Sequence, residues 1–459
     1  MLRGLGIAVV LLVLCAVPAA ADGVALDWSV ADRLNGPPSI DESAPARATT
    51  LRVAVDANGA CPRDPRFALD GEAISAHATA GCAFDLAPVQ PGEHRLKLDD
   101  DQGEEQAATD VDVRDLLVVS LGDSVASGEG NPDPEGPGFH WLEKRCHRSL
   151  RSGAALATRA VERGDRHSVI TLVPLACSGA TIDAGLLGAY DGVQPDRRRG
   201  QLPPQLDVLD QLTRPVDAVL LSVGANDVNF GALALFCVAV RNCPARRFDP
   251  AHPTREARAS FPTAAEVERQ ALERLANSYD RLAARLARTI APAKTIVVEY
   301  FDPLRDANGD VCSRAFFGRL DQAEGQWAER NVLAPLNATI EAAAARHGWQ
   351  VVGGVADAFR RHGICAGHDA WVADPRHSFT AELALTGTLH PNGPGHVATA
   401  TLIAPTLAAT LGIAPGIVAD NASQSGRVPW PWLLVTAAAG ALAALLIHRV
   451  VSTRRRERR

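Results

Sequence analysis

Short runs of apolar residues without alternation recur from residue 115 onward, and they constrain the fold more than any other feature of the chain. A strand that is apolar on both faces is typical of a parallel sheet buried between two layers of helices. Stretches with an apolar stripe at helical spacing lie between the runs, the longest over residues 264–290. This alternation predicts an α/β fold, a doubly wound parallel sheet, over residues 114–412. The predicted strands are residues 116–120, 169–173, 218–222, 295–298 and 349–352, and further helices are predicted over residues 325–346 and 394–411.

Residues 49–113 have a different pattern, in which apolar and polar residues alternate within short segments. Alternation places every second side chain on the same face, as in half-buried antiparallel strands. Turn-forming clusters separate these segments, which predicts a small β-sandwich domain. Cys61 and Cys82 fall inside it, where a disulfide would support a small core. Residues 22–48 contain three prolines and are predicted to be an N-terminal linker.

The two ends of the chain carry targeting signals. Residues 1–21 combine a positive charge, a short apolar core and small residues at their end, which predicts a secretory signal peptide. An uncleaved N-terminal anchor is the alternative. After a linker over residues 413–429, residues 430–451 are long and apolar enough for one transmembrane helix. The arginine-rich tail, residues 452–459, is then expected in the cytoplasm and the bulk of the chain outside the cell. The alternative for the apolar run is a buried core helix.

The cysteine count agrees with an extracellular location. Nine cysteines less Cys15 of the signal peptide leave eight, and an even number outside the cell favours disulfides. Eight cysteines allow 105 pairings, so spacing alone does not choose among them. No pair has the spacing of a zinc ribbon or a thioredoxin-type site. The formal net charge of −7 also makes a nucleic-acid partner improbable.

Polar and glycine residues follow three of the predicted strands. Gly122-Asp123-Ser124 comes after the first strand, Gly179 after the second, and Gly224-Ala225-Asn226-Asp227 after the third. His390 stands near the end of the domain. Because the carboxyl ends of parallel strands meet at one edge of a sheet, these residues are expected to lie together there. A nucleophile, a base and hydrogen-bond donors are the parts that acyl transfer needs.

With these four motifs in this order, residues 115–411 resemble the SGNH (GDSL) family of esterases and lipases. The resemblance implies a flavodoxin-like sheet, Ser124 as nucleophile and His390 as general base. It also implies an oxyanion hole made by the backbone N–H groups of Ser124 and Gly179 and by the side-chain amide of Asn226. No metal and no cofactor is implied.

One position departs from the family pattern. The family usually has an aspartate three residues before the histidine, where this chain has Gly387. The chain is similar to a branch of secreted bacterial lipases in which a backbone carbonyl orients the base, and this implies the same role for Gly387. Asp374 and Asp369 are the alternatives. The same branch implies three disulfides in the hydrolase domain, Cys146–Cys177, Cys237–Cys243 and Cys312–Cys365, beside Cys61–Cys82 in the sandwich.

The sequence allows two interpretations of the role of several residues. His396 is expected to be structural, or to be an alternative base if His390 points away. Asp123 is expected to bond the turn rather than to act in acid–base chemistry. Residues 306–310 resemble the start of a calcium loop, but Phe317 stands where the bidentate glutamate belongs, so a turn is expected. Apolar residues after Asn226 are either core or acyl pocket: Phe230, Leu233, Leu235 and Phe236.

The leading functional hypothesis is an extracellular serine esterase or lipase, tethered to the cell membrane by its single C-terminal helix. Its substrate would be a small-molecule or lipid ester. One alternative is an O-deacetylase or acyltransferase on cell-envelope polysaccharide. Another is a non-catalytic envelope-binding protein on the same scaffold.

Overall fold

The computed structural model describes residues 24–31, 48–57, 61–62, 64–136, 138–414 and 417–418. The predicted signal peptide, transmembrane segment and cytoplasmic tail lie outside these residues. Within them, no helix has both the length and the apolar character needed to cross a membrane. The described residues fall into two units that divide between Arg114 and Asp115, one residue after the predicted boundary.

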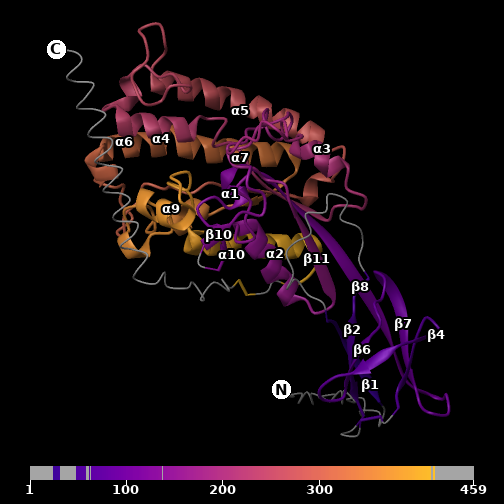
Figure 1. The fold of residues 1–459 in the computed structure, drawn as a ribbon. Coiled ribbons are helices and arrows are strands. Elements are labelled where there is room, and N and C mark those ends of the chain that lie inside the picture. Colours follow the sequence, from indigo (N-terminus) through magenta and orange to yellow (C-terminus); the bar gives the residue numbers. More distant parts are fainter. Residues whose placement is uncertain are drawn as a thin grey trace, which may run out of the picture. The chain divides into compact units, whose positions relative to one another are not determined.

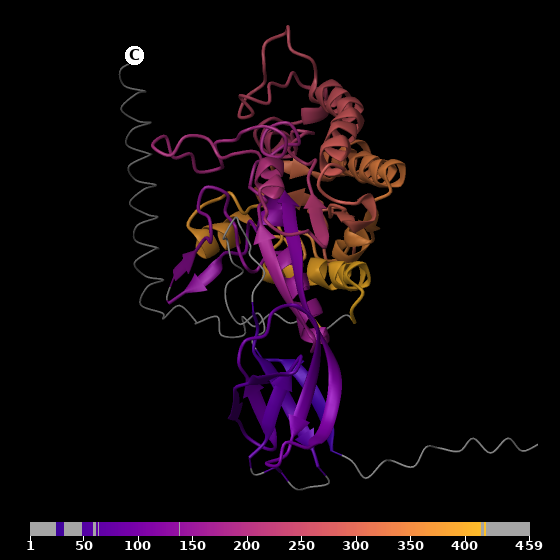
Figure 2. The same cartoon turned by 90° about the vertical axis from the view of Figure 1, so that its right-hand side faces the viewer.

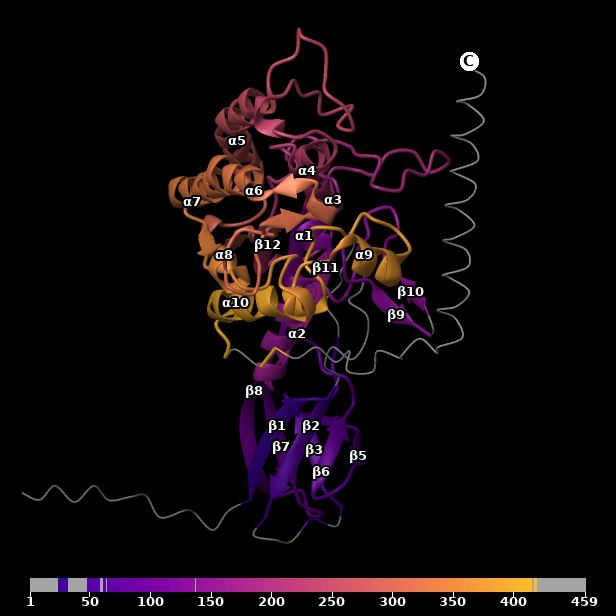
Figure 3. The same cartoon turned by 90° about the vertical axis from the view of Figure 1, so that its left-hand side faces the viewer.

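The first unit is the predicted β-sandwich, built from two antiparallel sheets (Figure 3). Burial alternates along its strands, as in residues 51–56, where every second side chain is buried. Phe67 and Phe84, from opposite sheets, pack with ring centroids 5.4 Å apart and join the two inner faces. One sheet contains β1 (Ala25–Val30), β2 (Leu51–Asp56), β6 (Ala83–Leu86) and β5 (Ala76–Ala78), and the other contains β8 (Glu105–Gly122), β7 (Gly92–Asp99), β3 (Arg66–Leu69) and β4 (Glu72–Ile74).

The structure corrects the predicted linker over residues 22–48. Its first part is strand β1, which pairs antiparallel with β2. Trp28 and Val30 of this strand are buried in the sandwich core. The apolar alternation covers only three positions, Leu26, Trp28 and Val30, and prolines follow shortly after. So short a pattern identifies a strand only when its partner in the sheet is known.

Strand β8 is longer than either strand predicted from its sequence. Its first part pairs antiparallel with β7, and residues 118–122 pair in parallel with β12 (Ala218–Ser222). The sequence indicated a sandwich strand ending at Val113 and a separate strand beginning at Leu116. The change from alternating to continuous apolar residues therefore marks a change in burial within one strand, from one buried face to two.

The sheet of the second unit has the flavodoxin-like order. β8 lies between β11 (Ser168–Pro174) and β12, followed by β13 (Thr295–Val298) and β16 (Gln350–Val352). In chain order this is 2-1-3-4-5, and the pairs β8–β12, β12–β13 and β13–β16 are parallel. All five predicted strands are therefore confirmed. The order reverses at β8, and ligands of such sheets bind beyond the carboxyl ends of the strands at this point.

Helices cover both faces of this sheet (Figure 1; Figure 2). One core cluster joins the sheet to α3 (Gln205–Asp210), α5 (Ala264–Leu286) and α7 (Ala334–His347). The other joins it to α2 (Gly153–Gly164) and α10 (Gly393–Leu411). Alternate side chains of the central strand enter opposite clusters, for example Leu117 and Val118.

The helix predicted over residues 325–346 is interrupted. It consists of α6 (Gln322–Ala328), one π-helical turn (Glu329–Leu333) and α7. Pro335 lies in the first turn of α7 and has no N–H to donate to the preceding turn, so regular α-helical bonding does not continue through it.

All four predicted disulfides are present: Cys61–Cys82, Cys146–Cys177, Cys237–Cys243 and Cys312–Cys365. The first lies within the sandwich, and the other three lie within the α/β unit.

The disulfide of the sandwich is expected to contribute to its stability. Its cysteines are 21 residues apart, and cross-linking a loop of this length restricts the unfolded chain by about 3 kcal/mol. Replacing both Cys61 and Cys82 by serine should lower the unfolding free energy of the sandwich by about that amount. Urea unfolding of the full chain, followed by hydrogen exchange in the sandwich strands, measures the change. Unaltered protection in those strands would contradict the expectation.

Candidate active site

Ser124 stands on a sharp turn at the carboxyl end of β8. Gly122 has φ +136°, and a Cβ at this position would lie 1.9 Å from the carbonyl oxygen of Ser222 on β12. Only glycine allows the two strands to approach in this way. Asp123 then caps α1 (Ser124–Ser127), because its Oδ1 accepts a hydrogen bond from the Val125 N–H at 3.1 Å.

Asp123 bonds the turn, as the sequence predicts. Besides capping α1, it accepts a hydrogen bond at 2.5 Å from the Tyr300 hydroxyl through Oδ2. The side chain is completely buried, and burial raises the pKa of Asp123 to about 7. Its two contacts are with groups of the scaffold, which supports a structural role.

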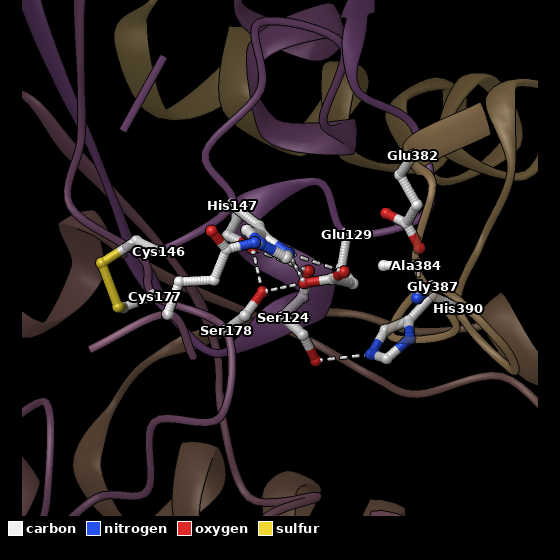
Figure 4. A network of polar contacts seen from close by, with 12 residues as sticks. Ser124, Glu129, Cys146, His147, Cys177, Ser178, Glu382, Ala384, Gly387 and His390 are labelled. Atoms are coloured by element: carbon white, nitrogen blue, oxygen red, sulfur yellow. Dashed lines mark hydrogen bonds and ion pairs between the residues drawn. A yellow bond between two sulfur atoms is a disulfide. The ribbon is translucent and has the colours of Figure 1, made fainter. Parts of the chain in front are cut away.

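His390 points at Ser124. Its Nε2 lies 2.7 Å from Ser124 Oγ, a hydrogen-bond distance (Figure 4). The histidine comes from the segment between α9 (Pro375–Glu382) and α10, directly after Leu389, which has φ +68°. Burial lowers the pKa of His390, and the attraction of Glu129 and nearby backbone carbonyls opposes this only in part. The ring is therefore neutral near pH 7, as an acceptor of the serine proton must be.

The expected hydrogen bond from the other ring nitrogen of His390, Nδ1, is not formed among the described residues. Gly387 was expected to accept a hydrogen bond from Nδ1, but its carbonyl accepts the backbone N–H of His390 at 3.0 Å. The carbonyls of Thr388, Thr386 and Gly387 favour the protonated ring. None of them meets the geometry of a hydrogen bond, and Nδ1 has no such partner among the described residues. Sequence spacing places Gly387 near the ring but does not determine which N–H its carbonyl accepts.

The other candidate groups lie apart from the ring of His390. Asp374 caps α9 by accepting the His377 N–H at 2.6 Å. The carboxylate of Asp369 lies 3.4 Å from the exposed His368. His396 is structural, because its Nδ1 accepts the Gly153 N–H and its Nε2 donates to the carbonyl of Glu129.

Gly179 and Asn226 line the same cavity as Ser124 and His390. Gly179 has φ +81°, and a Cβ here would lie 2.2 Å from the Tyr190 hydroxyl oxygen. The side-chain amide of Asn226 donates one hydrogen bond to the Ala180 carbonyl at 3.0 Å. An amide nitrogen carries two hydrogens, so this bond holds the side chain in place and leaves a second donor for a ligand.

The cavity is large and mostly apolar. Its volume is about 700 Å³. Helix α4 (Phe230–Ala239) supplies part of its wall, which divides the four apolar residues whose role the sequence left open. Phe230 and Leu235 line the cavity, whereas Leu233 and Phe236 are buried in the core. The remaining apolar lining includes Val125, Val238, Phe301, Pro303, Val332, Leu336, Leu385 and Leu389.

A buried polar cluster that was not predicted from the sequence lies beside the catalytic candidates. Glu129, His147 and Ser178 are each at least 98% buried and hydrogen-bonded to one another through Glu129 (Figure 4). Glu129 and Ser178 also line the cavity. A glutamate between two glycines, five residues after Ser124, was the available signal, but its partners come from distant parts of the chain.

Glu129, His147 and Glu382 bring three potential metal-ligating atoms within 4.8 Å of one another. Hydrogen bonds already engage both oxygens of Glu129 and both ring nitrogens of His147. These bonds account for the cluster without an ion. Residues 306–310 form the expected turn, in which Asp306 Oδ1 accepts the N–H groups of Asn308 and Asp310.

The chain is similar to known proteins in sequence and in structure. The GDSL-like Lipase/Acylhydrolase family matches residues 120–398. An extracellular lipase from Streptomyces rimosus is structurally similar, with 20% identity, a TM-score of 0.43, and coverage of 64% of this chain and 99% of the lipase. A family two carbohydrate esterase from Clostridium thermocellum is also similar, with 11% identity, a TM-score of 0.31, and coverage of 85% and 100%. No curated protein matches the chain.

The close approach at Gly122 gives a stability prediction. Gly122→Ala places a methyl group against the backbone of β12, and we expect it to destabilise the chain by more than about 2 kcal/mol. Gly231→Ala is the matched control, because Gly231 lies in α4 with no atom within 4 Å of an added Cβ. It should be neutral or stabilising by up to about 1 kcal/mol. Thermal unfolding measures the stability of both variants. Equal effects would contradict the conclusion that the close contact with β12 requires glycine at residue 122.

Proposed function

Since the chain belongs to the GDSL-like lipase/acylhydrolase family, we propose that it is a serine hydrolase of carboxylic esters with extended acyl chains. One observation carries this proposal. Ser124 Oγ lies 2.7 Å from His390 Nε2 in the wall of an apolar cavity of about 700 Å³. A hydroxyl and a neutral imidazole at this distance form a nucleophile with its base.

In the proposed reaction Ser124 Oγ attacks the ester carbonyl while His390 Nε2 takes its proton. The backbone N–H groups of Ser124 and Gly179 and the second amide hydrogen of Asn226 stabilise the negative oxygen of the tetrahedral intermediate. His390 then returns the proton to the leaving alcohol as the acyl-enzyme forms. Water attacks the acyl-enzyme in the same way and releases the acid.

The shape and polarity of the cavity support the choice of substrate. Its volume falls in the range of about 300–1,000 Å³ that is typical of small-molecule sites, and it far exceeds the needs of an acetyl group. Phe230 and Leu235 offer apolar surface to an acyl chain rather than donors for a sugar.

The sandwich gives little support to the alternative of a polysaccharide deacetylase or acyltransferase. Stacking of sugars on a binding domain needs exposed aromatic side chains. The three aromatic residues described in this unit, Trp28, Phe67 and Phe84, are all buried.

We propose an extracellular location and a membrane anchor on separate grounds. Four disulfides are typical of proteins that fold in an oxidising compartment. The anchor rests on the apolar sequence of residues 430–451 alone.

A substrate panel tests the proposed function. We expect kcat/KM on p-nitrophenyl esters to rise from acetate toward longer chains as methylenes enter the cavity, at about 1 kcal/mol or somewhat less per buried methylene. Ser124→Ala should lose activity by about 10⁴-fold or more while remaining folded. A preference for acetyl esters or acetylated glycans would favour the deacetylase. Full activity of Ser124→Ala would refute the nucleophile.

The burial of His390 gives a pH prediction. The base must be neutral, and burial lowers its pKa, so the ring stays neutral to lower pH than an ordinary histidine. The acid limb of kcat/KM should therefore lie below about pH 6.5. Asp374→Asn keeps the cap of α9 and should cost less than tenfold, with the limb unmoved. A loss near 10⁴-fold would identify Asp374 as a member of a triad.

A further inference from the structure

His390 lacks the partner that usually stabilises a catalytic histidine. Its Nδ1 is buried and has no hydrogen-bond partner among the described residues. When Nε2 takes a proton from Ser124, the ring becomes a partly buried cation, which is costly in a site of low dielectric constant without a compensating charge. A charge that offsets this cost has to come from a group close to the ring.

Glu129 is in the right place to supply it. It lies in the same cavity wall as Ser124 and His390, with its side chain 1% exposed. Its backbone N–H donates to the carbonyl of Ser124 at 3.1 Å, so the glutamate belongs to the nucleophile's own turn. The next residue, Gly130, packs closely against the segment that carries the base. A Cβ at Gly130 would lie 2.7 Å from the Pro391 carbonyl oxygen and 3.3 Å from His390 Cβ.

The hydrogen bonds of Glu129 leave it negatively charged. His147 Nδ1 lies 2.8 Å from both carboxylate oxygens, and the Ser178 hydroxyl donates to Oε2 at 2.5 Å. The other ring nitrogen of His147 faces Gln194 Nε2, an amide donor, at 2.6 Å. This nitrogen must accept, so Nδ1 of His147 carries the proton that is donated to the carboxylate. His147 and Ser178 thus both donate hydrogen bonds to the carboxylate of Glu129, which favours its ionised form.

The other buried carboxyl groups nearby do not carry the same charge. Burial raises the pKa values of Asp123, Asp227 and Glu382 to about 7. Burial also opposes ionisation of Glu129, but the hydrogen bond from His147 and the attraction of His390 outweigh it and lower the pKa. Of these four groups, only Glu129 has a lowered pKa, so it is the carboxyl group that stays ionised to the lowest pH.

We infer that Glu129 is a positioning residue for the base: its carboxylate, fixed by His147 and Ser178, stabilises the protonated ring of His390 without a hydrogen bond to it. This rests on the proposed function, in which His390 takes the serine proton. As the proton moves from Ser124 Oγ to His390 Nε2, the ring gains one positive charge, and the negative charge of Glu129 offsets it. The absent triad aspartate is thus replaced by a carboxylate on the nucleophile's turn.

The disulfide Cys146–Cys177 holds this arrangement together. His147 follows one of its cysteines and Ser178 follows the other, so both donors to Glu129 are adjacent to the same covalent bond. Trp141 also stacks on the His147 ring, with centroids 4.6 Å apart. Such fixed donors are what a carboxylate needs if it is to act at a defined place.

The test removes the charge of Glu129 and measures how the protonation of His390 changes. Glu129→Gln keeps the size of the side chain, and Glu129→Asp keeps its charge. Glu162→Gln is the matched control, because Glu162 is a buried glutamate on α2 that accepts the Ile170 N–H and has no part in the site. The rate of inactivation of the full chain by a fluorophosphonate, measured from about pH 4.5 to 8, reports the protonation of the base without an ester substrate.

We expect Glu129→Gln to move the acid limb down by about one pH unit, because the ring loses the charge that favours its protonated form. At the pH optimum the rate should fall about tenfold, which corresponds to the same shift. Glu129→Asp should return the pH of the acid limb most of the way to its wild-type value. Glu162→Gln should change neither the acid limb nor the inactivation rate.

The outcomes separate this inference from the proposed function. If Glu129→Gln lowers the inactivation rate but leaves the pH of the acid limb unchanged, Glu129 has only a structural role and the inference is overturned. The same result follows if Glu129→Asp behaves like Glu129→Gln. Should the wild-type chain fail to react with the fluorophosphonate, the serine nucleophile itself is refuted, and the role of Glu129 with it. Reaction without ester turnover would refute only the proposed substrate class.

Discussion

The pairing of β8 with β12 is the constraint from which the site follows. The two strands stay paired in parallel as far as Gly122 and Ser222. At this point Gly122 lies so close to the backbone of Ser222 that a side chain would not fit. The chain must turn at this point, and Asp123 fixes the turn by capping the short helix that begins with Ser124. The place and direction of the hydroxyl are thus set by the packing of a sheet that is buried on both faces.

The second half of the site depends on the close contact of two loops. The turn after Ser124 reaches the segment that carries His390, where Gly130 leaves no room for a side chain beside Pro391. Glu382, at the end of α9, accepts hydrogen bonds from the Gly387 N–H and the Ser378 hydroxyl and so fixes that segment from the other side. The 2.7 Å distance between Ser124 and His390 is therefore a product of several backbone contacts rather than of one strong bond.

The sequence predicted those features that depend on short segments. Buried strands such as residues 169–173 are apolar except for one threonine, and Ser124 and Asn226 stand shortly after such strands, so their common edge followed from the fold class. Strand β1 was missed because its burial comes from pairing with β2. Glu129 was missed for the same reason: Ser178 lies 49 residues away in sequence, and only the folded chain shows that they meet. The disulfide pairs were predicted through a family resemblance, not from their spacing.

The bond between Cys146 and Cys177 has a consequence for when the chain becomes active. It joins the segment of His147, which bonds Glu129, to the segment of Ser178 and Gly179, which line the cavity of the proposed active site. In a reducing compartment this bond does not form. A newly made chain would then have its serine and histidine but not the rigid frame around them. We expect such a chain to be less active than the oxidised one, because fewer contacts would hold these segments in place.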